Sequence, residues 1–517
     1  MLIPIIAQSL LWDDFYPVSH RLYPHNHDMY PIGPYLYPLV ITLLVSCSSP
    51  TIDQRLESHV HHLASDDFMG REAGTTHEKE AAEYIRETFI SIGLEPIGEN
   101  DSYYQDFEFL AGKSPNDNIR LRINDEQLTY GVDFLPLCFS SKGAVRGNRQ
   151  YLTVNADTKL SDLSLNRPKD EIANPIFFIE LPDVRANPYI GYWQAKDLRN
   201  LSIQAKDAGA KAVVFFVGDS AIFDPKSALD HHVSSIDIPA IFLSKAEPDR
   251  STTQLVQIEM DWTEDRRVGR NVLGMIDNGA DHTIIVGGHH DGLGYSQASG
   301  MDELIIHNGA DDGVSGLAVL IEMAREIKKK ASEKYNYIFI SFSGEEKGLL
   351  GSMYFSHFPT IDMKKVTCML SMDHVGRMDS EITSFILYGV GTSPRWAELL
   401  AELNVEENEM ITYDTGIGLT DHTPFYIKDI PVLSFATQVH EDFHQPTDVP
   451  ENINYQGMVK IYEVMLQIDS LLLSEQKLPF SGTIDPAEAL NFIEGLIEYA
   501  FEGRVTVDDP QLARPTD

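Results

Sequence analysis

Cysteine and positive charge are both scarce in this sequence, and each shortage excludes a class of protein. The 517 residues include only three cysteines, Cys47, Cys138 and Cys368, which are too few for a disulfide framework. Lysine and arginine number 40 against 78 aspartates and glutamates, so the formal net charge is 40 − 78 = −38. Binding to nucleic acid requires basic patches that neutralise phosphates, so nucleic acid is not expected as a partner.

The N-terminal region lacks a hydrophobic run long enough to span a bilayer. Its apolar run, residues 36–46, is short and fits the core of a signal peptide better than a transmembrane helix. The run ends in LVSC at residues 44–47, which resembles a bacterial lipoprotein signal. We therefore expect residues 1–46 to be a cleaved leader and Cys47 to attach the protein to a membrane through a lipid. The expected location is the periplasm or the cell surface.

Apolar runs alternate with amphipathic helices in the second half of the chain. The runs occupy residues 282–288, 335–343, 366–372 and 431–437. Continuous apolar strands between helices predict an α/β fold with a mixed, mainly parallel sheet that is flanked by helices.

The chain divides into segments of different character. Short β-type runs with Pro and Gly punctuation predict an inserted, mostly β domain at residues 112–260. We expect one domain to be formed by residues 47–111 and 261–473 together, followed by an acidic extension at 474–517.

Residues that bind divalent metals follow each of the four apolar runs. The sequence places His289 and Asp291, Glu345 and Glu346, Asp373, and His444 after these runs, and the pair Asp311-Asp312 just before a predicted helix. In open α/β sheets the carboxyl ends of the strands meet at one edge, where sites form. Imidazole nitrogens and carboxylate oxygens suit Zn²⁺. Two histidines and three acids complete a pair of zinc sites if one carboxylate is shared.

The adjacent carboxylates Glu345 and Glu346 predict two different roles. Successive side chains that leave a strand point in different directions, so one can bind metal while the other acts as a general base. Zinc lowers the pKa of a bound water to about 7, and a neighbouring carboxylate can then take its proton.

Five sequence blocks resemble the signatures of a known enzyme family. The blocks are GGHHDG, GADDGVSG, SGEEKGLLGS, SMDHVGRM and DFHQPTDVPENINYQGM. They are similar, in order and spacing, to those of the zinc aminopeptidases that include bacterial leucyl aminopeptidases and glutamate carboxypeptidase. The resemblance covers residues 52–110 and 262–470. The segment QAKDAGAKAVVFF with IDIPAIFLS looks like a protease-associated domain in the insert.

The resemblance implies a role for each candidate residue. Glu345 would be the general base, and Asp291 would orient its neighbouring ligand from outside the metal site. The implied cofactor is two Zn²⁺ per chain, bridged by Asp311, and the implied substrates are peptides. The implied metal ligands are His289, Asp311, Glu346, Asp373 and His444.

One position departs from the family pattern. Many relatives carry a tyrosine just before the last ligand, where its hydroxyl supports the oxyanion, but this chain has Phe443. Either zinc alone polarises the carbonyl, or Tyr413 or His422 supplies the hydrogen bond.

The main expectation is an aminopeptidase that removes N-terminal residues from peptides. Two alternatives on the same fold are a carboxypeptidase and a glutaminyl-cyclase-like enzyme. A receptor-like relative without activity is disfavoured because no ligand block is broken.

Overall fold

The computed structural model describes most of the chain after the expected leader. The expected leader 1–46, Cys47 and residues 483–517 of the acidic extension lie outside the described residues. No helix among the described residues combines the length and the apolar character needed to cross a membrane. The described residues are 49–116, 118–154, 164–165, 173–181, 195–217, 235–244, 254–297, 304–330, 334–379, 383–406 and 409–482.

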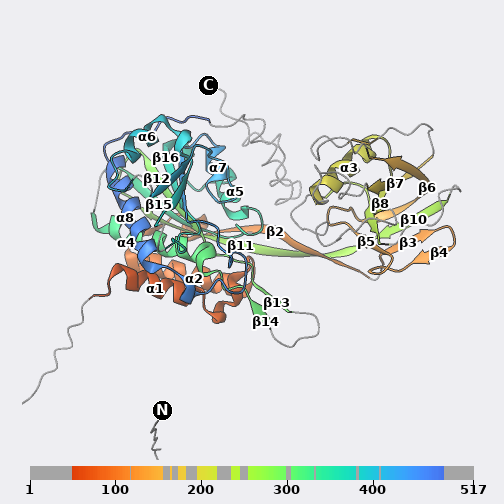
Figure 1. Ribbon diagram of the computed structural model, residues 1–517, viewed down its shortest axis with the longest axis horizontal. Helices are drawn as coiled ribbons and strands as arrows, with labels where there is room; N and C mark the ends of the chain where they lie inside the picture. The colour runs from red at the N-terminus through yellow and green to blue at the C-terminus, as the bar shows by residue number, and fades with distance from the viewer. Residues whose placement is uncertain are drawn as a thin grey trace, which may run out of the picture. The chain divides into compact units, whose positions relative to one another are not determined.

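A mixed nine-stranded sheet organises the main domain (Figure 1). Its strand order is β1-β11-β15-β12-β16-β19-β17-β18, and β2 also pairs with β11. Four neighbouring strands run parallel to each other: β15 (Asn336–Phe342), β12 (Thr283–His289), β16 (Val366–Met372) and β19 (Val432–Ala436). Every residue of β12, β15 and β16 is buried, which explains their continuous apolar sequences. The predicted α/β fold is confirmed.

The outer strands make the sheet mixed. Strand β11 is antiparallel to β15, and β17 is antiparallel to β19. These strands are β1 (Glu95–Pro96), β2 (Tyr104–Pro115), β11 (Trp262–Ile276), β17 (Phe385–Tyr388) and β18 (Met410–Tyr413).

Successive strand residues point to opposite sides of the sheet. Both faces therefore carry apolar side chains, and helices cover both. Ile284 and Val286 of β12 pack into one core cluster, and Ile285 between them packs into another. The first cluster includes residues of α1 (Ile52–Leu63), α2 (Thr76–Ile92), α4 (Gly316–Lys330), α6 (Pro394–Leu400) and α8 (Tyr455–Leu472). The second includes residues of α5 (Leu350–His357) and α7 (Thr423–Tyr426).

A separate eight-stranded sheet lies between β2 and β11 in the sequence. The chain leaves the main sheet along β2 and returns along β11, and these two strands pair antiparallel from Tyr104 to Pro115. The sheet carries one described helix, α3 (Ala195–Asp207), and packs its own core clusters. Its strands are β3 (Arg120–Ile123), β4 (Glu126–Leu128), β5 (Phe134–Pro136), β6 (Gly143–Thr153), β7 (Pro175–Leu181), β8 (Ala212–Val217), β9 (Ala240–Leu243) and β10 (Leu255–Met260).

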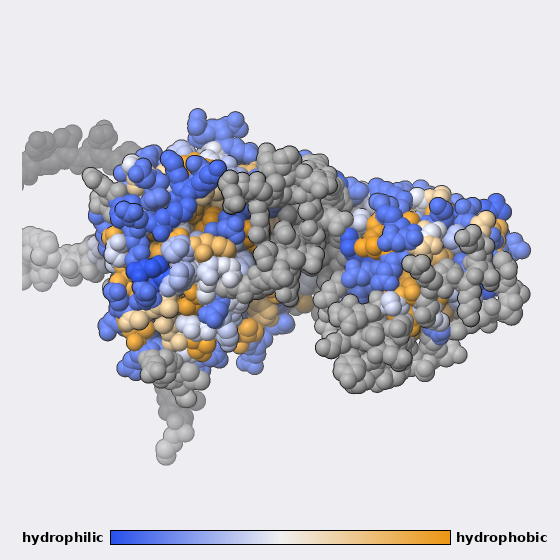
Figure 2. Space-filling view, turned by 90° about the horizontal axis from the view of Figure 1, so that it is seen from above, coloured by the Kyte–Doolittle hydropathy of each residue, from blue (hydrophilic) through white to orange (hydrophobic). Residues whose placement is uncertain are grey.

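One face of the described residues is largely polar (Figure 2). Figure 2 shows hydrophilic residues over much of one face, with smaller hydrophobic areas between them.

A short hairpin, β13 (Tyr295–Gln297) with β14 (Leu304–Ile306), completes the described strands.

Candidate metal centre

The candidate ligands come from the carboxyl ends of the parallel strands. His289 is the last residue of β12, and Asp373 directly follows β16. Glu345 and Glu346 lie in the turn after β15, and His444 lies in the loop after β19. Because parallel strands end at the same edge of a sheet, side chains far apart in the sequence meet there.

Two groups of candidate ligands share Asp312. The first group is His289, Asp312 and Asp373, and the second is Asp312, Glu346 and His444, with the ligand atoms of each group within 4.8 Å of one another. His289 Nε2 lies 3.5 Å from Asp312 Oδ1 and 3.2 Å from Asp373 Oδ1. His444 Nε2 lies 3.1 Å from Asp312 Oδ2 and 3.4 Å from Glu346 Oε2. Each oxygen of Asp312 therefore faces one group.

The structure corrects the assignment of the shared carboxylate, which is Asp312 and not Asp311. Both oxygens of Asp311 have other partners: Oδ1 accepts a hydrogen bond from the Gly376 amide at 2.6 Å, and Oδ2 lies 3.0 Å from His440 Nε2. Asp311 belongs instead to a third group with His374 and His440.

The backbone explains why two adjacent aspartates face different groups. The turn η6 (Ala310–Ser315) departs from helical geometry at Asp312, where ψ is 98°, and at Gly313, where φ is 86°. A Cβ atom on Gly313 would lie 2.7 Å from Cε1 of His289, so only glycine allows the turn to approach the imidazole. The sequence shows two equivalent acids, and only this turn distinguishes them.

Two further carboxylates hold the loops that carry the ligands. Asp448 accepts hydrogen bonds from the amides of Asp311 and Asp312 at 3.0–3.1 Å. Asp291 accepts hydrogen bonds from the amides of Glu345 and Glu346 at 3.1 and 3.4 Å. Asp291 Oδ1 also lies 3.6 Å from His289 Nδ1. This is the position expected of a residue that orients a metal-binding histidine.

Burial and mutual repulsion raise the pKa values of two carboxyls at the site, whereas hydrogen bonds with histidines lower the pKa of a third. Burial and the charge of Asp312 raise the pKa of Glu346 to about 7. Burial also raises the pKa of Glu345 well above its usual value, and nearby Asp373 adds to the shift. Burial opposes ionisation of Asp311, but hydrogen bonds with His374 and His440 lower its pKa to about 2. Hydrogen bonds to Asp312 and Glu346 raise the pKa of His444 to about 10.

The donor set fits divalent metal ions of the zinc type. Asp312, Glu346 and Asp373 have side chains that are only 5–7% exposed, so their charges are poorly solvated. Buried carboxylates at this density require cations to balance them. Imidazole with carboxylate is a usual zinc donor combination.

The two candidate oxyanion residues lie in different surroundings. Tyr413 is 47% exposed and stacks on Tyr388 with ring centroids 5.1 Å apart. His422 is only 1% exposed, its Nδ1 lies 2.6 Å from Thr420 Oγ1, and burial lowers its pKa to about 4. The Nε2 edge of His422 packs against Gly418. Support of an oxyanion by either residue stays a prediction.

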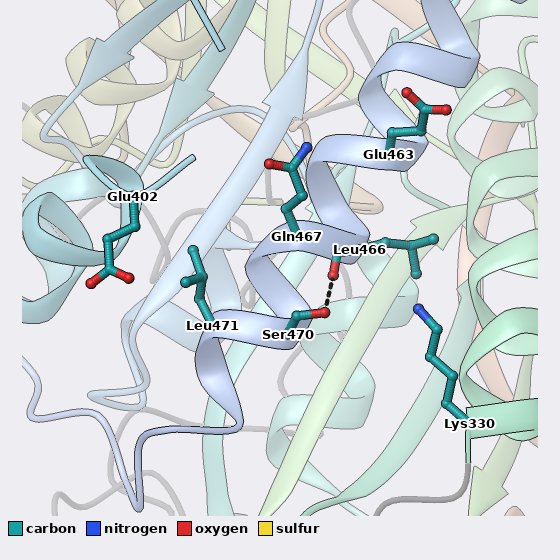
Figure 3. Close-up of a pocket in the computed structure, with 7 residues that line it drawn as sticks. All are labelled: Lys330, Glu402, Glu463, Leu466, Gln467, Ser470 and Leu471. Atoms are coloured by element: carbon teal, nitrogen blue, oxygen red, sulfur yellow. Dashed lines mark hydrogen bonds between the residues drawn. The ribbon is translucent and has the colours of Figure 1, made fainter. Parts of the chain in front are cut away.

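A pocket of about 520 Å³ along α8 is not this site. Figure 3 shows part of its lining, with Glu463 on α8, Glu402 in the turn after α6 and Lys330 at the end of α4. Its remaining lining residues are Leu466, Gln467, Ser470 and Leu471, and no member of the metal groups contributes.

Two curated proteins are similar in sequence to part of this chain. The chain is 27% identical to the aminopeptidase YwaD of Bacillus subtilis over 264 residues, which are 48% of this chain and 54% of that protein. It is 36% identical to a probable leucine aminopeptidase of Trichophyton verrucosum over 219 residues, which are 38% of this chain and 54% of that protein. The chain thus spans about half the length of the curated relatives that it matches.

A solved structure has the same fold. The aminopeptidase from Aneurinibacillus sp. strain AM-1 superposes with a TM-score of 0.53 at 20% identity, over 84% of this chain and 95% of that one. The model of peptidase family M28 matches residues 271–469, which include both candidate metal groups. Residues 271–469 of this chain are thus similar in sequence to peptidase family M28.

Proposed function

We propose that this protein is a zinc-dependent aminopeptidase with two zinc ions per chain. The observation that carries the proposal is the shared carboxylate, because Asp312 presents one oxygen to each of two candidate ligand groups. His289 and Asp373 would complete one zinc site, and Glu346 and His444 the other. Two metals that share a carboxylate are typical of sites that clamp both oxygens of a displacement reaction.

Glu345 would act as the general base. Its backbone amide donates to Asp291, which fixes the start of its side chain beside the metal groups. Bound zinc ions would supply Lewis acidity to a peptide carbonyl and would lower the pKa of a coordinated water. The Glu345 carboxylate would accept the proton of the attacking water and pass it to the nitrogen of the leaving amine. Burial, with the charges of Asp373 and Glu346, raises the pKa of Glu345 and so makes it a stronger base.

The charges around the site favour recognition of an amine over a carboxylate. Binding of a free C-terminal carboxylate usually needs an arginine with a free guanidinium fork. Arg377 is instead bonded to the carbonyl of Asn452 and to Asp442, and Arg395 is paired with Glu475. Spare carboxylates can hold a free α-amine directly. We therefore propose cleavage at the N-terminus, and the carboxypeptidase and cyclase alternatives are not favoured.

Three forms of one dipeptide test the direction of cleavage. We expect hydrolysis of the free dipeptide and of its C-terminal amide, and loss of hydrolysis when the α-amine is acetylated. Zinc measured in the same sample should be close to two per chain, and chelation should remove both zinc and activity. Cleavage that tolerates acetylation and fails on amidation would show a carboxypeptidase.

We further propose export with a lipid on Cys47, from the sequence of residues 36–47 alone. The mass of the mature protein from its native host tests this proposal, with Cys47→Ala as the variant that should lack the lipid.

We also propose that the eight-stranded sheet is a protease-associated domain. Its support is the helix and strand order of α3, β8 and β9, and deleting it should alter KM for long peptides more than kcat for dipeptides.

A further inference from the structure

The turn η1 (Asp66–Arg71) lies outside the segment that matches the peptidase family, yet it contacts both loops of the first metal group. Its last residue, Arg71, is fully buried. Arg71 Nε donates to the carbonyl of His290 at 2.8 Å. Arg71 Nη1 and Nη2 donate to the carbonyls of Asn308 and Gly309 at 2.8 and 3.1 Å. One guanidinium thus bonds to the residue after His289 and to the start of the turn that carries Asp312.

Backbone contacts of η1 reinforce this connection. The amide of Gly292 donates to the carbonyl of Arg71, and the amide of Gly294 donates to the carbonyl of Gly70. A Cβ atom on Gly70 would lie 2.2 Å from the Gly294 carbonyl oxygen, so the approach of the two backbones requires glycine. Arg71 itself has a positive φ of 52°. A non-glycine residue is held in that conformation only when its surroundings determine it.

The remaining bond of Arg71 ties the turn to the first helix. Nη1 also donates to the carbonyl of Leu63, the last residue of α1, at 2.7 Å. The guanidinium therefore bridges four carbonyl oxygens on three separate segments. Lysine offers a single ammonium group in place of this planar fork, so it cannot reach all four acceptors in the same geometry.

We propose that Arg71 is a positioning residue for the metal centre, which sets the spacing between His289 and Asp312 and thereby the rate at which zinc leaves the first group. The proposal rests on the proposed metal centre. Arg71 touches no candidate ligand atom, and it acts through the main chain of residues adjacent to two ligands. Partners of this outer kind typically change metal affinity by about 10–100-fold when they are lost.

Arg71→Lys in the full zinc-loaded chain is the first test. This variant keeps the positive charge and loses the fork, so we expect zinc transfer to a chelator to become about 10–100-fold faster. Tyr335→Phe is the matched control, because the Tyr335 hydroxyl is buried and lies 2.9–3.1 Å from three carbonyl oxygens at and just beyond the end of α8. The control should lower the unfolding temperature without changing zinc release. Unchanged zinc release in Arg71→Lys, with a similar loss of stability, would overturn the proposal.

Hydrogen exchange on the unmutated protein is the second test, and it needs no variant to fold. Because coupling between sites is reciprocal, zinc should slow amide exchange in residues 66–72 at the same concentrations at which it protects residues 307–316. Residues 472–476, near Tyr335, should not respond. Protection of 307–316 without protection of 66–72 would overturn the role of Arg71. Failure of the unmutated chain to take up any zinc would refute the metal centre itself, and the proposal with it.

Discussion

Replacement of Asp312 and of Asp311 by asparagine should have opposite consequences for metal content. Asp312→Asn removes a charged oxygen from both candidate groups. Loss of an outer partner already costs about 10–100-fold in metal affinity, so loss of a direct ligand should cost more than about 100-fold at each site. Zinc per chain, measured after dialysis against a zinc buffer that just saturates the unmutated protein, should fall from about two to nearly zero.

Asp311→Asn should keep both zinc ions and lose stability. The introduced amide would retain an acceptor for the Gly376 amide but would face His440 Nε2 with a second donor. Loss of one buried hydrogen bond to a charged group costs about 1.5–3 kcal/mol, which lowers the unfolding temperature by roughly 3–12 °C in a domain of this size. Asp373→Asn is the control, because Asp373 belongs only to the group with His289 and Asp312, so this variant should lose one of the two zinc ions. Retention of zinc by Asp312→Asn and its loss from Asp311→Asn would refute the assignment.

The proposed chemistry makes three further predictions. Glu345→Gln should retain zinc and lower kcat by about 10²–10⁴-fold, as expected for a general base; loss of zinc would show that Glu345 is a ligand. The zinc-free protein should lose stability as pH rises from 5 to 9. Folding raises the pKa of Glu346 to about 7 and that of His444 to about 10, so the folded chain binds more protons than the unfolded chain. A rising unfolding midpoint over this range would contradict these shifts. Zinc binding at pH 7 should release protons. Calorimetry in buffers of different ionisation enthalpy measures this release. Uptake of protons on zinc binding would be inconsistent with a protonated His444.

The fold class was predictable because the pattern that encodes it is local. Strands buried on both faces must be apolar throughout, so the runs that became β12, β15, β16 and β19 were visible in the sequence. A local signal also ends α2, because Gly93 at its C-terminus adopts a left-handed conformation with φ of 86°.

The candidate ligands were predictable because parallel strands bring their carboxyl ends to one edge. His289, Glu346, Asp373 and His444 each follow a separate apolar run, and the structure brings all four into groups that share one aspartate. The alternation of strand and helix therefore carried information about the site as well as about the fold.

Only the tertiary structure decided between Asp311 and Asp312, and only it revealed Arg71. Adjacent aspartates are equivalent in a sequence, and they are separated here by a turn whose shape depends on the His289 ring packed against Gly313. Arg71 lies 219 residues before the carbonyl it contacts at His290, and no periodic pattern records that distance. Sequence alone determined which residue types lie at the edge of the sheet, because burial and spacing are local properties. The side chain that each one faces was set by long-range packing.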